Sequence, residues 1–454
     1  MKYRILILLV IFVLSSIRLN SQDNYLYFLN NTDDATLARI KIIETAKKEL
    51  LISYFIFDDD PFGLVSLDVL LLQKELYPDL KIRILLDASA NGIDKSLLYY
   101  MEQHGIEIKE FHPLPKLFVP WSKMSIKNFF NALNNLNYRM HDKMILADDD
   151  MLIIGGRNIE NSYYGLNSKN FHDRDLFFKS KPLVADVREY FNQLWNSNHV
   201  QKITYYHGDK KGKWRDKMVN KLINIRKYIL SKKSIYQKLI SAIDPKTKGI
   251  KFKKVKFLNS YDKVKNKFNP EFLSTSLYNL TINTKKSFII ETPYLLPTIR
   301  FYKLLRYFKS KGVKMQFVTN SFCSTDAMPV AAAYDNEKPK LEELGVELYE
   351  YLGPDYLHAK SAVFDDSLAL VGSYNMDPRS AYINTELVFV IDDKNIAKEL
   401  KRLITEDMEN SISTKVISDN SFGGFYDCDK SRKAIMTYVI FKFLTKFGWL
   451  YNLF

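Results

Sequence analysis

The chain has 454 residues, 46% of them hydrophobic, and its 66 basic and 52 acidic residues give a formal net charge of +14. With 16 glycines and 14 prolines, this composition excludes collagen-like and largely disordered chains. Cys323 and Cys428 are too few for a disulfide scaffold or a zinc site made of cysteines alone, and leave one disulfide or two free thiols as alternatives.

The first 21 residues have the pattern of a signal peptide. Lys2 and Arg4 precede an apolar run from Ile5 to Leu14, and Arg18 ends the apolar stretch before the roughly 20 residues that a spanning helix needs. Residues 1–21 are therefore expected to be a cleaved signal peptide or a short membrane anchor. In either case the rest of the chain is expected to leave the cytoplasm.

A similar unit occurs twice, in residues 22–200 and 271–412. Each copy contains an apolar strand, a helix, a second strand and another helix, followed by GIEIKEF (105–111) or GVELYEY (345–351). Strands that alternate with helices are typical of α/β domains, in which a sheet packs between helices. The repeat therefore predicts two α/β domains.

A motif with identical spacing occurs in each copy after the strands and helices described above. It reads H-x-K-x4-D-x6-G-[GS]-x-N, with 17 positions from the histidine to the asparagine in both copies. Its members are His141, Lys143, Asp148, Gly156 and Asn158 in the first copy, and His358, Lys360, Asp365, Ser373 and Asn375 in the second. Two matches at the same spacing are not expected by chance.

The residue types of this motif suit chemistry on a phosphodiester. In a strand, His-x-Lys places both side chains on one face, where the ammonium group stabilises charge that phosphate oxygens gain in the transition state. The asparagine amides can donate further hydrogen bonds. Two histidines that face each other across one phosphorus predict a nucleophile and a general acid and base. No metal or other cofactor is needed for this chemistry.

Each motif histidine also needs a carboxylate that fixes its tautomer. Glu386 is the candidate after the second motif, and aligning the strand ELVF with DLFF favours Asp175 over Asp173 after the first. Asp148 and Asp365 lie at an odd offset from the motif lysines, which predicts roles in hairpin turns or packing rather than catalysis.

Residues 201–270 form a basic segment between the two copies. From Lys202 to Lys267 there are 21 basic residues and four acidic ones, a net charge of +17. This charge favours binding to phosphates, without distinguishing an anionic membrane surface from nucleic acid, of which nucleic acid is the less favoured partner. A solvated connection between the domains is the third alternative.

Residues 413–454 form a tail that ends in AIMTYVIFKFLTKFGWLYNLF (434–454). Lys442 and Lys446 share one helix face, beside a broad apolar surface. The pattern predicts an amphipathic helix that lies in a membrane interface, and docking on the protein core is the alternative.

The duplicated motif resembles the signature of the phospholipase D superfamily, and the nearest likeness is to bacterial cardiolipin synthases of the C type. The stretches that carry this resemblance are RMHDKMILADDDMLIIGGRNI (139–159), TNSFCSTDAMPVAAAY (319–334), GVELYEY (345–351) and LVGSYNMDPRSAYINTEL (370–387). The resemblance implies two phospholipase D-like domains, each a mixed sheet flanked by helices. A pseudo-twofold axis would relate the domains and bring both motifs into one shared active site.

The resemblance also implies an activity. A phosphatidyl group would pass through a phosphohistidine, commonly on the N-terminal histidine, here His141, to an alcohol such as phosphatidylglycerol. Hydrolysis of phospholipid headgroups and a phosphodiesterase or nuclease activity are the alternatives, and an inactive membrane scaffold is disfavoured because both motifs are intact. Phospholipids are then the substrates and no obligatory protein partner is expected. A membrane-associated enzyme in the periplasm or on the outer face of the inner membrane fits the N-terminal pattern.

Overall fold

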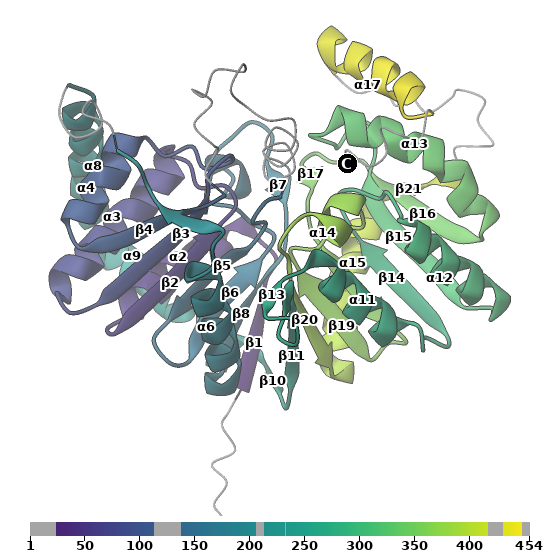
Figure 1. Ribbon diagram of the computed structural model, residues 1–454, viewed down its shortest axis with the longest axis horizontal. Coiled ribbons are helices and arrows are strands. Elements are labelled where there is room, and N and C mark those ends of the chain that lie inside the picture. The colour runs from purple at the N-terminus through teal and green to yellow at the C-terminus, as the bar shows by residue number, and fades with distance from the viewer. Residues whose placement is uncertain (1–23, 113–137, 206–212, 232, 416–429, 447–454) are drawn as a thin grey trace, which may run out of the picture.

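The computed structural model describes residues 24–112, 138–205, 213–231, 233–415 and 430–446. Two halves lie side by side, and each has a sheet of mixed strand directions with helices packed against it (Figure 1). The two-domain α/β fold expected from the sequence is therefore confirmed. The expected signal peptide or anchor, residues 1–21, lies outside the described residues.

The first half contains a nine-stranded sheet. Its strands, from edge to edge, are β10 (Ile250–Phe252), β1 (Asn24–Leu29), β8 (Asp175–Lys179), β6 (Met151–Gly155), β5 (Lys143–Ala147), β2 (Glu49–Tyr54), β3 (Lys81–Asp87), β4 (Ile106–Phe111) and β9 (Val200–Lys202). Its helices are α2 (Thr32–Thr45), α3 (Pro61–Leu76), α4 (Lys95–Gln103), the 3-10 turn η2 (Asn161–Tyr163), α6 (Lys181–Trp195), α8 (Lys213–Ser231), α9 (Lys233–Ala242) and α10 (Pro245–Lys248). Strands β2, β3 and β4 run parallel to one another, and the other neighbours are antiparallel.

The second half contains an eight-stranded sheet that repeats this arrangement. Its strands, from edge to edge, are β11 (Val255–Asn259), β20 (Leu387–Asp392), β19 (Leu368–Gly372), β18 (Ser361–Phe364), β14 (Ser287–Glu291), β15 (Lys314–Asn320), β16 (Val346–Tyr351) and β21 (Ser411–Ser413). Its helices are α11 (Pro270–Thr281), α12 (Ile299–Ser310), α13 (Met328–Glu343), α14 (Pro378–Tyr382), α15 (Lys394–Glu409) and α17 (Arg432–Leu444). Order and direction match those of the strands from β1 to β9 in the first sheet.

Local chemistry explains where several helices begin. Helices α3, α6 and α14 follow Asp60, Ser180 and Asp377, whose side chains each accept a hydrogen bond from a backbone N–H of the first turn. Each of these helices also has a proline in its first turn, where the missing N–H costs no helical hydrogen bond. Asp377 in this way places α14 directly after the second motif.

The basic segment 201–270 is divided between the two halves rather than lying between them. Strand β10 is an edge of the first sheet, β11 is an edge of the second, and β12 (Tyr261–Asp262) pairs with β13 (Lys267–Phe268). Helix α8 lies at the outer end of the first half (Figure 1), where Leu222 is buried and Arg226 bonds to Asp68 at 2.9 Å. Part of the positive charge of this segment therefore forms ion pairs within the folded protein.

One large hydrophobic core lies where the two halves meet. One cluster is formed by the apolar faces of α6 and α15 and by the facing sides of both sheets. In it, the ring centroids of Phe178 in the first sheet and Phe389 in the second lie 5.2 Å apart. Two further clusters fill the outer sides of the sheets, beneath α2, α3 and α4 in the first half and beneath α11, α12 and α13 in the second. The shared core holds the halves together as one body.

Candidate active site

The segment before each motif forms a short parallel β pairing with the other half of the molecule, which brings the two motif histidines together. Just before the second motif, β17 (Tyr356–Leu357) pairs in parallel with β7 (Phe171–His172) of the first half. At the equivalent place before the first motif, Met140 pairs in parallel with Thr385 of the second half. Each histidine is thus presented to the other half of the molecule.

Each histidine binds a carboxylate that the other half provides. Nδ1 of His141 lies 3.0 Å from both carboxylate oxygens of Glu386, and Nδ1 of His358 lies 2.5 Å from Oδ2 of Asp173. The histidines are 8% and 5% exposed, and both carboxylates are fully buried. A carboxylate on Nδ1 fixes the tautomer and leaves Nε2 of each ring available to a ligand.

The sequence comparison favoured Asp175 as this partner in the first copy, which is wrong. Gly155 pairs with Asp175 across the first sheet, and Gly372 pairs with Val388 across the second. Asp175 is therefore the counterpart of Val388, and Asp173, two residues earlier, is the counterpart of Glu386. Matching the letters DL with EL shifted the alignment by two residues.

Asp175 has a structural environment instead. Its Oδ2 bonds to Arg39 at 2.9 Å and to Arg157 at 3.1 Å, and all three side chains are buried in the first half. Arg157 also donates to the carbonyl of Leu29 at 2.8 Å. These contacts tie α2, β1 and the end of the first motif together behind the histidine site.

Motif residues Gly156 and Ser373 occupy equivalent positions and serve the two carboxylates differently. A Cβ on Gly156 would lie 2.2 Å from Oδ1 of Asp173, so only glycine leaves room for this carboxylate. Ser373 donates its hydroxyl to Glu386, and Ser380 donates to the other oxygen of Glu386 at 2.7 Å. Ser380 was not predicted, and its place in the DPRS sequence after the motif gave no signal beyond its polarity.

The motif lysines are almost completely buried beside the histidines. Nζ of Lys143 donates to the carbonyl of His141 at 2.7 Å, and Nζ of Lys360 donates to the carbonyl of His358 and lies 3.8 Å from Asp173. Burial lowers the pKa of Lys143 to about 7 and lowers that of Lys360 as well. An anionic ligand would favour the charged form of both lysines.

The motif asparagines are held at the same site. Asn158 accepts from the backbone N–H of Ile56 at 3.2 Å and donates to the hydroxyl of Tyr163 at 3.0 Å. That hydroxyl is 3.4 Å from Nδ1 of His358, so Tyr163 is a site residue that the sequence did not single out. The side-chain oxygen of Asn375 is buried and has no hydrogen-bond partner within the described part of the chain.

Asp148 and Asp365 lie away from the histidines, in the hairpin turns at the far ends of β5 and β18. Both have a positive φ, 46° and 50°. Asp148 accepts hydrogen bonds from the backbone N–H groups of residues 47–49, and Asp365 does the same for residues 285–287. Each holds the beginning of the neighbouring strand, β2 or β14, and touches no other motif residue in these contacts.

The two histidine pairs differ in their electrostatics. Burial raises the pKa of Glu386 to about 7, and burial together with the charges of Lys143 and Lys360 lowers that of His141 well below its usual range. Around Asp173, the charges of Lys360 and His358 outweigh burial and hold its pKa well below the usual range. Burial also lowers the pKa of His358, to about 4, so both histidines are uncharged at neutral pH, and His358 differs in facing a carboxylate that is held ionised. The lysines of both motifs act on His141, as expected for one site.

In the described residues, no group of three or more His, Cys, Asp or Glu side chains could hold a metal ion. The arrangement provides two imidazoles with fixed tautomers, two buried ammonium groups and amide donors. These groups are suited to bind an anionic phosphodiester between the histidines.

Comparisons with known proteins identify the family. A family model described as cardiolipin synthase, PLD-like domain, matches residues 40–195 and 278–408. An uncharacterized protein of Helicobacter pylori strain ATCC 700392 / 26695 is 28% identical over 83% of this chain and 78% of its own length. Cardiolipin synthase C of Escherichia coli K12 is 28% identical over 84% of both chains.

The fold also matches a solved structure, phosphatidylserine synthase of Haemophilus influenzae Rd KW20. The TM-score is 0.66 at 14% sequence identity, over 96% of this chain and 98% of the other. The family model covers more than half of the present chain, including every motif residue. The chain therefore belongs to the cardiolipin synthase family of phospholipase D-like enzymes.

Proposed function

We propose that the enzyme is a cardiolipin synthase that transfers a phosphatidyl group from one phospholipid to a hydroxyl group of another through a phosphohistidine. The crossed pairs His141–Glu386 and His358–Asp173 carry this proposal, because they prepare two histidines at one phosphate site. The kinship with a protein named cardiolipin synthase C supports a phospholipid substrate.

In the first step Nε2 of His141 attacks the phosphorus. The P–N bond forms while the P–O bond to the leaving alcohol breaks, and Nε2 of His358 gives its proton to the leaving oxygen. Lys143 and Lys360 stabilise the charge on the phosphate oxygens. The leaving alcohol departs neutral, and His358 is left as a base.

In the second step His358 takes the proton from the hydroxyl group of the acceptor phospholipid. The resulting oxygen nucleophile attacks phosphorus, the new P–O bond forms and the P–N bond to His141 breaks. His358 is protonated again and His141 is neutral again, so the site is ready for another turnover. Phosphatidylglycerol, which has free hydroxyl groups, is the proposed acceptor.

The difference between the two pairs supports His141 as the nucleophile. Its low pKa keeps it uncharged, as an attacking nitrogen must be. His358 must carry a proton to act as the acid, although burial, followed by the charge of Lys360, lowers its pKa to about 4 in the ligand-free protein. A bound phosphodiester anion counteracts the lysine charges, and ionised Asp173 stabilises the imidazolium form.

Helix α17 supports contact with a membrane surface. One face docks on α13, where Tyr438 is buried and Lys442 bonds to Asp335 at 2.7 Å. The side chains that are exposed form one apolar stripe along the helix: Ile435, Met436, Val439, Ile440 and Phe443. Arg432, Lys433 and Lys446 are exposed near the helix ends, so the surface combines apolar area with positive charge.

We place this stripe on the lipid surface that supplies the substrates. In Figure 1, α17 lies toward the same edge of the molecule as β7 and β17, the strands that bring the histidines together. No helix in the described ranges is long and apolar enough to cross a bilayer. The exposed lysines of the basic segment would add attraction to anionic lipids. The remainder of the tail, 416–429 and 447–454, lies outside the described residues.

Export from the cytoplasm remains a proposal. Its first support is the N-terminal pattern of residues 1–21. Its second support is that Cys323 is disulfide-bonded, because such bonds persist in oxidising compartments outside the cytoplasm.

Mass spectrometry of lipids tests the proposed activity. The purified protein is incubated with vesicles of phosphatidylglycerol and phosphatidylethanolamine, alongside His141→Gln and His104→Gln variants. His104 is exposed at the end of α4, so its replacement controls for the loss of a histidine. We expect cardiolipin from the wild type and from His104→Gln but not from His141→Gln. Phosphatidic acid without cardiolipin would make the enzyme a hydrolase, and an unchanged lipid profile would point to nucleic acid as the substrate.

A further inference from the structure

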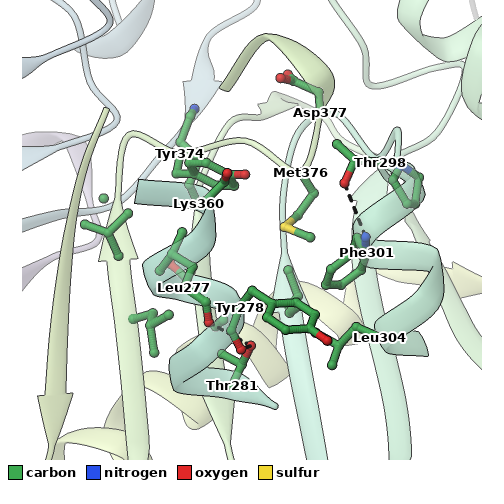
Figure 2. A pocket seen from close by; sticks show the side chains of 18 of the residues that line it. Leu277, Tyr278, Thr281, Thr298, Phe301, Leu304, Lys360, Tyr374, Met376 and Asp377 are labelled. Carbon is green, nitrogen blue, oxygen red and sulfur yellow. Dashed lines mark hydrogen bonds between the residues drawn. The ribbon is translucent and has the colours of Figure 1, made fainter. Parts of the chain in front are cut away.

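An apolar pocket lies between α11, α12 and the second sheet (Figure 2). Its cavity volume is about 110 Å³, and the empty space grows to about 870 Å³ when the open solvent at its mouth is included. Leu277 of α11 and Phe301 and Leu304 of α12 contribute to its walls. Its floor is the outer face of the sheet, where it is lined by Ala362 and Val388.

One end of this pocket reaches Lys360 of the second motif, although neither motif histidine is among the residues that line it. Lys360, Tyr374 and Asp377 line that end, whereas the opposite end is lined by side chains such as Thr281 and Leu304 (Figure 2). Lys360 is the lysine that contacts His358 and lies near Asp173. The pocket and the phosphate site thus share Lys360, so a molecule with its phosphate at the histidines has apolar space beside that lysine, between the helices.

The corresponding space in the first half is filled. By motif spacing, Arg157 is the counterpart of Tyr374, and by strand register Asp175 is the counterpart of Val388. In the first half these two side chains bond to each other at 3.1 Å, and Arg39 from α2 joins them at 2.9 Å. The two halves share a fold, but in the second half apolar side chains line an open pocket at this place.

We propose that this pocket binds an acyl chain of the phosphatidyl group that the enzyme transfers, a proposal that rests on the proposed function. A phosphatidyl group joins an anionic phosphate to long hydrocarbon chains through glycerol. With its phosphate between the histidines, a chain can enter the apolar space beside Lys360. The phosphatidyl group is the part of the substrate that remains bound in both steps, since the leaving alcohol and the acceptor exchange on the other side of phosphorus.

This assignment explains why the pocket is apolar and adjacent to one catalytic lysine only. Each methylene group that moves from water into an apolar environment strengthens binding roughly fourfold. A chain held in the protein would also keep the phosphohistidine intermediate from drifting away from the acceptor. The enzyme should therefore distinguish donors by the length of their acyl chains.

The test fills the pocket and compares donors. Ala362→Phe adds a ring at the floor of the pocket, and Leu277→Trp adds bulk at its wall as a second variant should the first not fold. Asn279→Trp is the matched control, because this residue of α11 is exposed. Headgroup release from dihexanoyl- and dioleoyl-phosphatidylglycerol in the same detergent micelles gives kcat/KM for each donor.

We expect the filled variants to lose about tenfold or more in kcat/KM for the dioleoyl donor, with the dihexanoyl donor and the Asn279→Trp control much less affected. Equal changes for both donors in a folded variant would overturn the proposal. If the wild type turns over neither donor, the proposed function fails and a second measurement decides the pocket. A phosphatidylglycerol with a diazirine near the end of one chain should crosslink to α11 or α12, and crosslinks confined to other elements would overturn the proposal.

Discussion

Asp173 and Asp175 lie two residues apart and have opposite roles, which two substitutions can separate. Asp173→Asn removes the charge that fixes the tautomer of His358 and stabilises its protonated form, at a distance of 2.5 Å. Asp175→Asn removes the partner of Arg39 and Arg157 in the core of the first half. The first change should reduce turnover and the second should reduce stability.

The magnitudes follow from the contacts. Loss of the carboxylate behind a catalytic histidine costs about 10⁴-fold in kcat in a serine protease triad, because the histidine takes the wrong tautomer. We expect a loss on the order of 10³-fold for Asp173→Asn, with little change in KM, because the carboxylate binds the histidine and not the lipid. Asp175→Asn leaves two buried guanidinium groups without their charged partner, which costs about 3–5 kcal/mol of unfolding free energy.

The assay measures cardiolipin formation at a temperature where both variants are folded, and unfolding by calorimetry. Circular dichroism of the aromatic side chains verifies the fold of each variant before the rates are compared. The reasoning is refuted if Asp173→Asn keeps more than a tenth of the wild-type kcat. It is equally refuted if Asp175→Asn loses turnover by the same factor while its stability is unchanged.

Two further predictions concern acid stability and membrane contact. Burial, followed by the charge of Lys360, lowers the pKa of His358 from 6.5 to about 4, so between these pH values the unfolded chain holds a proton that the folded chain lacks. Folding stability should therefore fall as the pH drops through this range, by up to about 3 kcal/mol from this residue. Urea unfolding at pH 7 and pH 5 should show a smaller fall in stability for His358→Gln than for the wild type. Equal falls in both proteins would contradict this prediction. On α17, Met436→Glu combined with Phe443→Glu should weaken sedimentation with phosphatidylglycerol vesicles more than about tenfold. The control Lys398→Glu, at an exposed position, changes the net charge of the protein by the same amount and should have a much smaller effect. Equal losses of binding in the two proteins would leave charge alone as the cause.

The sequence identified the motif residues because their geometry is local. His-x-Lys, the hairpin turn at Asp148 or Asp365 and the asparagine follow one another along adjacent strands, so identical spacing in both copies implies identical placement. Asp148 and Asp365 could also be assigned to turns from their odd offset. The six residues proposed to contact the phosphate could therefore be predicted without knowing which distant parts of the chain lie next to them.

The carboxylate partners could not be assigned in this way. Asp173 lies before β8 begins, so strand periodicity does not apply to it, and it follows Asn158 by 15 residues whereas Glu386 follows Asn375 by 11. Its pairing with His358 depends on the contact of β7 with β17, which joins residues about 185 positions apart. Only the register of both sheets reveals which carboxylate is equivalent to Glu386.

The sequence did not predict the pocket, and it predicted the last helix but not which of its faces is docked and which is exposed. Whether a space is filled depends on the combined volume of side chains from several elements. Arg157 and Asp175 bond to each other in the first half, whereas their counterparts in the second half, Tyr374 and Val388, line an open pocket. For α17, one face docks on the protein and the other is exposed, so the two alternatives for this helix described different sides of it. Tyr438 and Phe443, five residues apart, fall on opposite sides of that division, 4% and 62% exposed.

Trapping the covalent intermediate tests the central claim most directly. A phosphatidyl donor with a p-nitrophenol leaving group needs no general acid in the first step, so His358→Asn should form the adduct and then stall, because no base activates the acceptor. The account predicts one equivalent of nitrophenol released in a burst, and peptide mass spectrometry that places the phosphatidyl group on His141. His141→Asn should show no burst. A burst in His141→Asn, with the adduct on His358, would reverse the proposed roles, and the absence of any adduct in both variants would contradict the two-step mechanism.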